Sequence, residues 1–263
     1  MEAFIKDIPK EYLALKINYC RQRLKELPKV DLKTHMILEV PTQLVIVGNH
    51  KYRVNSPKGE EYLKIMKIRA NTEKQLQLYE SIWDYKRIED PQPEFKPHKV
   101  IRTMYVDTDK RVVLDKKYFD SLKNDADTNY PKPKDYPFDG ILYRSAAERD
   151  IAICYTEMGI PFKYEPEVMI KGLPKPIYPD FVAYIEELDN CKFHEHFGMK
   201  NSSNYLRITN IKYNNYMNAG LVPELDILFT YDVEEIPFDI RTLFYKFTSA
   251  VLSTMISTKH LGR

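Results

Sequence analysis

The sequence predicts an α/β protein in two parts: a mostly helical N-terminal region with one β-hairpin, and then a mixed central sheet flanked by helices. A stretch around residues 124–140 is rich in Pro, Asp and Asn, which is typical of a linker or a long surface loop. Before it, apolar residues recur mostly at helical spacing. Behind it, helical and strand patterns alternate. We therefore expect an N-terminal region at residues 1–135 and a second domain at residues 136–263.

In the N-terminal region, helical periodicity predicts helices over residues 11–27, 59–88 and 115–124. Residues 36–54 have the pattern of two strands joined by a Gly48–Asn49 turn. No residue in this region indicates a specific chemistry. We expect the region to bind the substrate or a protein partner.

In the second domain, the first helix has Ser145 as its N-cap, Glu148 three residues later to complete a capping box, and Gly159 at its end. Three hairpin-length strands follow, then a crossover helix that ends at Gly220, another strand and a final helix. This order predicts a sheet of mixed direction. The expected strands are 162–170, 177–185, 191–199 and 225–232, and the later helices are 203–219 and 239–256.

Composition excludes several classes of protein. The 40 Lys and Arg residues balance 38 Asp and Glu residues, so net charge indicates no partner. Three scattered cysteines without a CxxC motif favour a reducing compartment over a disulfide framework. No stretch approaches the roughly 18 apolar residues of a membrane span, and the N-terminus lacks the apolar segment of a secretion signal. We expect a cytoplasmic protein that does not enter a membrane.

Two acidic residues stand where strands normally carry apolar side chains. Asp180 adjoins an apolar run, and Glu195 alternates with Phe193 and Phe197. A carboxylate among phenylalanines needs a partner, and a metal ion is the usual one. Glu148, besides capping its helix, could supply a third carboxylate at the sheet edge. Oxygen ligands suit Mg²⁺ or Mn²⁺, which accept phosphate oxygens as further ligands. The pattern outlines a site that cleaves phosphodiesters.

At these residues the chain resembles the PD-(D/E)XK nuclease superfamily, and more closely a bacterial branch with a PDF…EH.G signature. The matching segments are "RSAAERDIA" with Glu148, "GIPFKYEP", "YPDF" with Asp180, "HEHFGM" with Glu195, and "KYNNYMNAG". The resemblance spans about residues 141–256. It implies a restriction-endonuclease-like fold and a Mg²⁺- or Mn²⁺-dependent nuclease that acts on nucleic acid, DNA rather than RNA. Asp180, Glu195 and Glu148 would be the metal ligands.

One position departs from the superfamily pattern, which has a lysine two residues after the third-motif acid. Here that position is Phe197. Three interpretations stay open: Lys212 reaches in from the following helix, His196 or His194 transfers the proton, or catalysis is lost. Lys212 lies four residues before Tyr216, so both share one helix face. Superfamily members place a helical polar residue and a tyrosine at the site in this way, which favours Lys212.

The two histidines also have other interpretations. Alternate strand residues point the same way, so His194 and His196 could hold zinc together with Cys154, Cys191 or a distant histidine. A histidine that orients the neighbouring carboxylate is the favoured account of His196.

Basic residues near the motifs are expected to contact a nucleic-acid backbone. These basic residues are Arg144, Arg149, Lys200 and Arg207.

A competing hypothesis is a catalytically inactive protein with a nuclease fold that binds nucleic acid or a protein partner.

Overall fold

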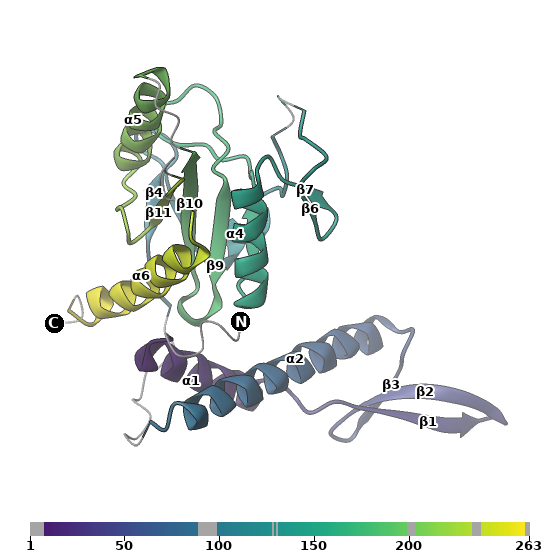
Figure 1. The fold of residues 1–263 in the computed structure, drawn as a ribbon. Coiled ribbons are helices and arrows are strands. Elements are labelled where there is room, and N and C mark those ends of the chain that lie inside the picture. The colour runs from purple at the N-terminus through teal and green to yellow at the C-terminus, as the bar shows by residue number, and fades with distance from the viewer. Residues whose placement is uncertain are drawn as a thin grey trace. The chain divides into compact units, whose positions relative to one another are not determined.

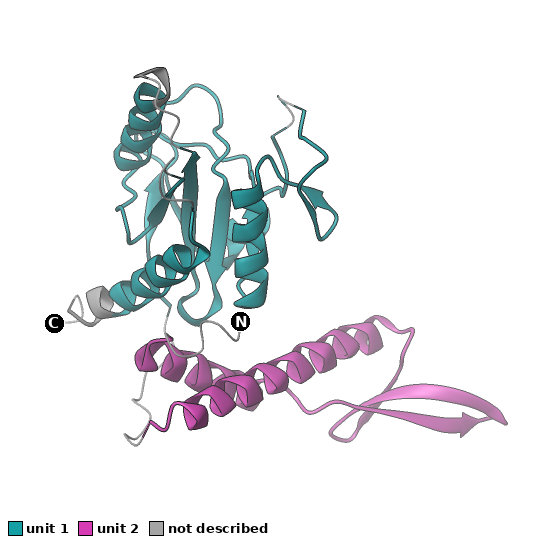
Figure 2. Ribbon diagram, in the orientation of Figure 1, with its two compact units in different colours: residues 1–4, 98–263 teal, residues 5–97 magenta. Residues whose placement is uncertain are grey.

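A computed structural model describes residues 8–88, 99–127, 129, 131–198, 203–232 and 238–260. The predicted mixed α/β class is confirmed: these residues contain six α-helices and four small sheets (Figure 1). Contacts within the chain divide it into two compact units, the first of residues 5–97 and the second of residues 1–4 and 98–263 (Figure 2). None of the three cysteines forms a disulfide, and each is buried. In the described ranges, no helix is long and apolar enough to cross a membrane.

Two helices organise the first unit. They are α1 (Lys10–Glu26) and α2 (Pro57–Tyr85). The Ser56 hydroxyl caps α2 by accepting a 3.1 Å hydrogen bond from the Gly59 amide. Arg69 of α2 donates hydrogen bonds to the Leu24 and Leu27 carbonyls near the end of α1, at 2.8 and 2.9 Å. Arg69 thereby satisfies carbonyl groups that a helix end leaves without partners.

A three-stranded antiparallel sheet completes this unit. Its strands are β1 (Asp31–Ile37), β2 (Val40–Val47) and β3 (His50–Arg53), in that order. The predicted turn at Gly48–Asn49 joins β2 to β3. The predicted first strand over residues 36–47 is wrong, because the chain reverses at Leu38–Glu39 and a further strand precedes that turn. Leu-Glu lacks the Gly and Asn that normally mark such a turn, so this turn has no local sequence signal.

The second unit is built on a four-stranded sheet of order β11-β10-β9-β8. Strands β8, β9 and β10 pair antiparallel, and β10 and β11 pair parallel across the α5 crossover, which confirms the predicted mixed direction. The elements are α4 (Ala146–Glu157), β8 (Phe162–Tyr164), β9 (Phe181–Ile185), β10 (Asn190–Gly198), α5 (Ser203–Asn218), β11 (Ile227–Asp232) and α6 (Ile240–His260).

The first two strands of this sheet are shorter than predicted. Strand β8 ends at Tyr164, because Glu165 has a positive φ of 40° and Pro166 lacks the amide that a ladder needs. Strand β9 begins at Phe181, so Asp180 immediately precedes it. The segment between the two strands is irregular and places Asp180 at the end of the sheet.

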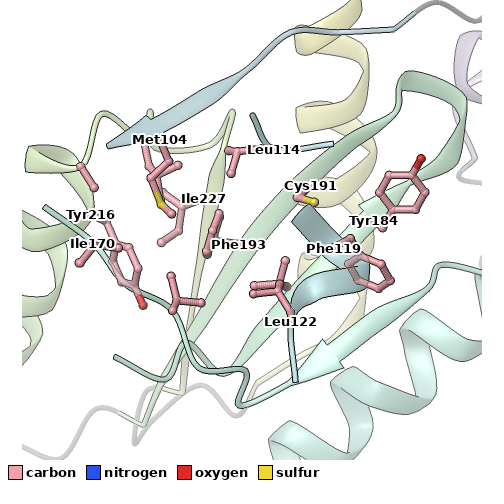
Figure 3. Close-up of a cluster of buried hydrophobic side chains, with 14 of the residues drawn as sticks. Met104, Leu114, Phe119, Leu122, Ile170, Tyr184, Cys191, Phe193, Tyr216 and Ile227 are labelled. Atoms are coloured by element: carbon pink, nitrogen blue, oxygen red, sulfur yellow. The ribbon is translucent and has the colours of Figure 1, made fainter. Parts of the chain in front are cut away.

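A large apolar cluster covers one face of the sheet (Figure 3). Phe193 and Cys191 of β10 meet Met104, Leu114 and Phe119 there. These last three residues belong to or adjoin β4 (Thr103–Tyr105), β5 (Arg111–Val113) and α3 (Lys116–Ser121).

This packing moves the predicted domain boundary. The predicted N-terminal region includes residues 98–135, whereas in the structure these residues belong to the second unit. Backbone hydrogen bonds tie this segment to the sheet: Val100 N to Leu188 O at 2.8 Å and Cys191 N to Leu114 O at 2.9 Å. The division lies instead near residue 97, at the end of a stretch with prolines at positions 91, 93 and 97. The 124–140 stretch is a surface segment within the unit and contains the short strands β6 (Pro137–Phe138) and β7 (Ile141–Leu142).

Helices α4 and α6 pack on the opposite face of the sheet. Tyr155 of α4 contacts Phe181 of β9 and Phe247 of α6, with ring centroids 5.8 and 5.5 Å apart. The two faces therefore have separate cores, and successive residues of β10 alternate between them.

Candidate active site

Asp180 and Glu195 face each other at the end of the β9–β10 ladder. The register pairs Val182 with Phe193 and Phe181 with His194. One further step along the same register sets Asp180 opposite Glu195, so both carboxylates leave the same face of the sheet. Asp180 Oδ2 accepts a 2.6 Å hydrogen bond from the His196 amide. Glu195 is buried, whereas Asp180 is partly exposed.

The charges of these acids act on each other. Limited contact with water and the negative charges of Glu195 and Glu148 raise the pKa of Asp180 well above its ordinary value, although Lys212 opposes them. Like charges that share a site cannot all ionise without compensation. The arrangement therefore favours a bound cation.

Helix α5 supplies two partners for Glu195. Lys212 Nζ lies 2.8 Å from Glu195 Oε2, and the Tyr216 hydroxyl donates a hydrogen bond to Glu195 Oε1. The Lys212 side chain is 42% exposed, whereas that of Glu195 is 1% exposed. Burial, together with the Glu195 charge, raises the pKa of Tyr216 well above its ordinary value, so its hydroxyl stays protonated and can donate. An ammonium group therefore lies beside the acid although the sequence has no lysine at Phe197.

Phe197 has a structural role instead. It lies two residues after Glu195 on the same face and is almost fully buried. Its ring stacks on Phe229 of the neighbouring strand, with the centroids 5.8 Å apart. A lysine here would have to place its charge within the aromatic cluster.

Ser145 is the N-cap of α4, as predicted, but the Glu148 carboxylate accepts from the Arg144 amide rather than from the Ser145 amide that a capping box would use, and it also contacts the neighbouring strand. The Glu148 amide donates to Ser145 Oγ at 3.1 Å, and its Oε1 accepts from the same hydroxyl. Its Oε2 accepts from the Tyr164 hydroxyl at 2.6 Å and from the Arg144 amide at 3.1 Å. Burial raises the pKa of Glu148 above its ordinary value. The side chain is thus held near Asp180 but turned toward other donors.

Among the described residues, no group of three or more His, Cys, Asp and Glu side chains is arranged to hold a metal ion. The expected cluster of Asp180, Glu195 and Glu148 is therefore not assembled as three direct ligands. Mg²⁺ is commonly bound by one or two carboxylates, with waters and substrate phosphates as its other ligands. The facing Asp180 and Glu195 carboxylates fit that requirement, and Glu148 fits a water-mediated contact.

The two histidines of β10 lie on the other face of the sheet. His194 Nδ1 is 3.0 Å from the Tyr155 hydroxyl, and His194 Nε2 is 2.8 Å from Thr230 Oγ1. His196 Nδ1 shares the same Thr230 oxygen at 2.9 Å. Burial lowers the pKa of His194 to about 3, so it is neutral at physiological pH. The side chain of His196 is thus directed away from Glu195, and its backbone amide is what reaches the site.

The predicted zinc alternative has no support in the described residues. The Cys154 thiol contacts Met158 Sδ at 3.7 Å, and the Cys191 thiol contacts the Asp115 carbonyl at 3.6 Å. Neither sulfur joins the two histidines in a group that could hold a metal.

Replacing Thr230 by Val should destabilise the protein by about 1–3 kcal/mol, because it leaves a ring nitrogen of the fully buried His194 without its partner. Urea unfolding followed by circular dichroism measures the change. Thr108→Val, at an exposed loop position, is the matched control and should change stability by less than about 0.5 kcal/mol. Equal stabilities of the two variants would show that the buried chain of hydrogen bonds contributes nothing.

The predicted nucleic-acid contacts differ in their surroundings. Arg144 forms ion pairs with Glu165 and with Asp127, so its guanidinium holds the framework around α4. Arg149 pairs with Asp150 at 2.8 Å. Arg207 is exposed on α5, whereas Lys200 lies outside the described residues.

Sequence reasoning missed Tyr164 and Glu165. Tyr164 donates to Glu148, and Lys132 lies over its ring, 4.3 Å from the centroid. The Glu165 carboxylate is buried and lies 2.9 Å from Lys132 Nζ. The sequence signal was weak, because "KYEPE" lies within the predicted strand 162–170 and reads as ordinary strand residues.

No family model, no curated protein and no solved structure matches this chain. The class of protein is therefore inferred from the geometry of the site. Two carboxylates face each other at the end of the sheet, and a lysine side chain contacts the buried carboxylate of Glu195.

Proposed function

We propose that this protein is a metal-dependent nuclease that hydrolyses phosphodiester bonds, in DNA rather than RNA. One observation carries the proposal. Asp180 lies opposite the buried Glu195, and Lys212 Nζ is 2.8 Å from the Glu195 carboxylate. In metal-assisted phosphodiester hydrolysis, carboxylates hold the metal ion that activates the water. A nearby ammonium group can stabilise the negative charge that develops on the phosphate.

The order of elements supports a restriction-endonuclease-like core. Helix α4 precedes an antiparallel β8-β9-β10 meander, and α5 leads to the parallel strand β11. Asp180 immediately precedes β9, and Glu195 lies within β10. Fold alone does not establish activity, so the proposal rests on the side chains.

Mg²⁺ or Mn²⁺ held by Asp180 and Glu195 would lower the pKa of a bound water and neutralise phosphate charge. The residues of the chain have complementary tasks. The His196 amide orients Asp180, and the Tyr216 hydroxyl orients Glu195. Lys212 is partly exposed, so its ammonium can contact a phosphate oxygen or the attacking water and stabilise the charge that develops there.

The alternative is a nuclease-fold protein that binds nucleic acid or a protein partner without cleaving. The buried position of Glu195 favours the enzyme. Removing an ion from water is costly, and the neighbouring Asp180 charge adds repulsion. A scaffold would be more stable with an apolar residue at this position.

Cleavage of plasmid and linear DNA tests the proposal. We expect cleavage with Mg²⁺ or Mn²⁺, none with EDTA, and binding without turnover with Ca²⁺, which is larger and more loosely coordinated. Glu195→Gln should reduce cleavage by about 10³-fold or more. The exposed Glu167→Gln should cleave like the wild type.

Two results would contradict the proposal. Cleavage that survives in both Asp180→Asn and Glu195→Gln variants would locate the chemistry elsewhere. Metal binding at these acids without cleavage of either substrate would favour the non-catalytic alternative.

A further inference from the structure

The sheet of the first unit extends as an arm whose tip is apolar. Strands β1 and β2 project from the helices of their unit and end in the Leu38–Glu39 turn (Figure 1). Leu38 is 93% exposed, Met36 67% and Val40 59%. These three residues, the apolar tip, bury little surface in the folded chain.

The backbone of the turn is unusual for its residues. Leu38 and Glu39 have positive φ angles of 50° and 64°, which a two-residue hairpin turn requires and for which Asn and Gly are strongly preferred. Leucine therefore neither favours this turn nor packs against the protein. A folding role does not explain it, and residues held in sparsely populated backbone conformations often occur at functional sites.

Basic side chains lie on the arm nearer the helices. The register aligns Lys33 with Leu44 and Leu44 with Arg53, so the two cations lie on one face of the sheet, with Lys51 two residues from Arg53 on the same face. All three basic side chains are exposed. Within the part of the chain that the structure describes, none of them forms an ion pair.

The arm is long enough to reach the floor of a DNA groove. Ile37, at the end of β1, lies four residues after Lys33, a distance of roughly 13 Å at about 3.3 Å per residue. The major groove admits a two-stranded β-ribbon and is about 8.5 Å deep, which is less than this length. With Lys33 on the phosphates at the rim, the apolar tip would therefore reach the base pairs.

We propose that this β-arm binds double-stranded DNA, with Lys33, Lys51 and Arg53 on phosphates and Leu38 inserted against a base step. Minor-groove binders show that an apolar side chain inserted into a base step unstacks it and bends the duplex, and Leu38 would do so from the major groove. Glu39, beside Leu38, can accept a hydrogen bond from a cytosine amino group. The choice of DNA as partner rests on the proposed function. Lysine is depleted from protein–protein interfaces, which disfavours a protein occupant.

Fluorescence anisotropy of the full chain with a labelled DNA duplex, in EDTA and over a series of salt concentrations, tests the arm independently of cleavage. Lys33→Gln/Arg53→Gln should weaken binding about tenfold and reduce the salt slope by about 1.8, since each lost phosphate contact contributes about 0.9. Leu38→Asn keeps a residue that tolerates the turn. It should weaken binding several-fold with an unchanged slope, and abolish the change in end-to-end energy transfer of a doubly labelled duplex.

Lys67→Gln/Lys74→Gln, at exposed positions farther along α2, is the matched control and should bind like the wild type. Wild-type affinity of both arm variants, or tighter binding of an RNA duplex than of DNA, overturns the proposal. Light scattering checks a further outcome. If Leu38→Asn changes the oligomeric state but leaves duplex binding unaltered, the proposal is also overturned, because the tip would then join two copies of the chain. A wild-type protein that binds through the arm without cleaving in Mg²⁺ overturns the proposed function alone.

Discussion

Asp180→Asn is expected to reduce the rate of DNA cleavage by about 10³-fold or more and, at the same time, to stabilise the metal-free protein. Cleavage should fail because one of the two carboxylates proposed to hold the metal is lost. Stability should rise because ionised Asp180 is poorly solvated and repelled by Glu195 and Glu148. Asparagine keeps a side-chain oxygen that can accept the hydrogen bond from the His196 amide. A gain of about 0.5–2 kcal/mol is the usual size for removing such an unfavourable group.

The pH dependence of this gain follows from the raised pKa of Asp180. The native state holds the proton more tightly than the unfolded state, so wild-type stability falls as pH rises from the ordinary aspartate pKa, about 3.9, through the raised native value. The Asn variant lacks this loss. We therefore expect equal stabilities at low pH and an increasing advantage of Asp180→Asn toward neutral pH.

Thermal unfolding in EDTA across this pH range measures the effect. The exposed Asp120→Asn is the control and should show no comparable increase. Mg²⁺ should raise the Tm of the wild type more than that of Asp180→Asn, since a ligand stabilises the state that binds it. A variant that is less stable than the wild type at neutral pH would mean that Asp180 is ionised and well compensated in the native protein.

Lys212→Ala is expected to lower the single-turnover cleavage rate by about 30- to 1,000-fold, which corresponds to about 2–4 kcal/mol of transition-state stabilisation. The Lys212 side chain places an ammonium group beside Glu195. The lysine that the superfamily pattern has two residues after this acid is replaced here by Phe197. Removal of Lys212 also leaves the buried carboxylate without its ion-pair partner.

Single-turnover rates of Lys212→Ala, His196→Ala and Lys117→Ala separate the open interpretations. Lys117 is an exposed lysine on α3, and its variant should cleave like the wild type. His196→Ala should retain most activity, since the His196 side chain contacts Thr230 on the other face of the sheet and only its backbone amide reaches Asp180. If Lys212→Ala cleaves normally and His196→Ala is inactive, the proton transfer belongs to the histidine.

The sequence alone determined the features that depend on local patterns. Ser145, Glu148 and Gly159 predicted the start and end of α4, because a capping box and a glycine stop act within one or two helical turns. Alternation along β10 separated Glu195 from the histidines on either side of it. The four-residue spacing of Lys212 and Tyr216 predicted their common helix face, and both contact Glu195.

Only the tertiary structure decided the features that depend on contacts between distant segments. The hairpin of β4 and β5 belongs to the second unit because Met104 and Leu114 pack on its sheet, although a proline-rich stretch follows it in the sequence. Sequence position predicted that Arg144 contacts a phosphate, whereas in the structure its guanidinium pairs with Glu165 and Asp127. Lys212 reaches Glu195 because α5 packs across β10. Burial and pairing are properties of the packed chain, so composition and spacing cannot supply them.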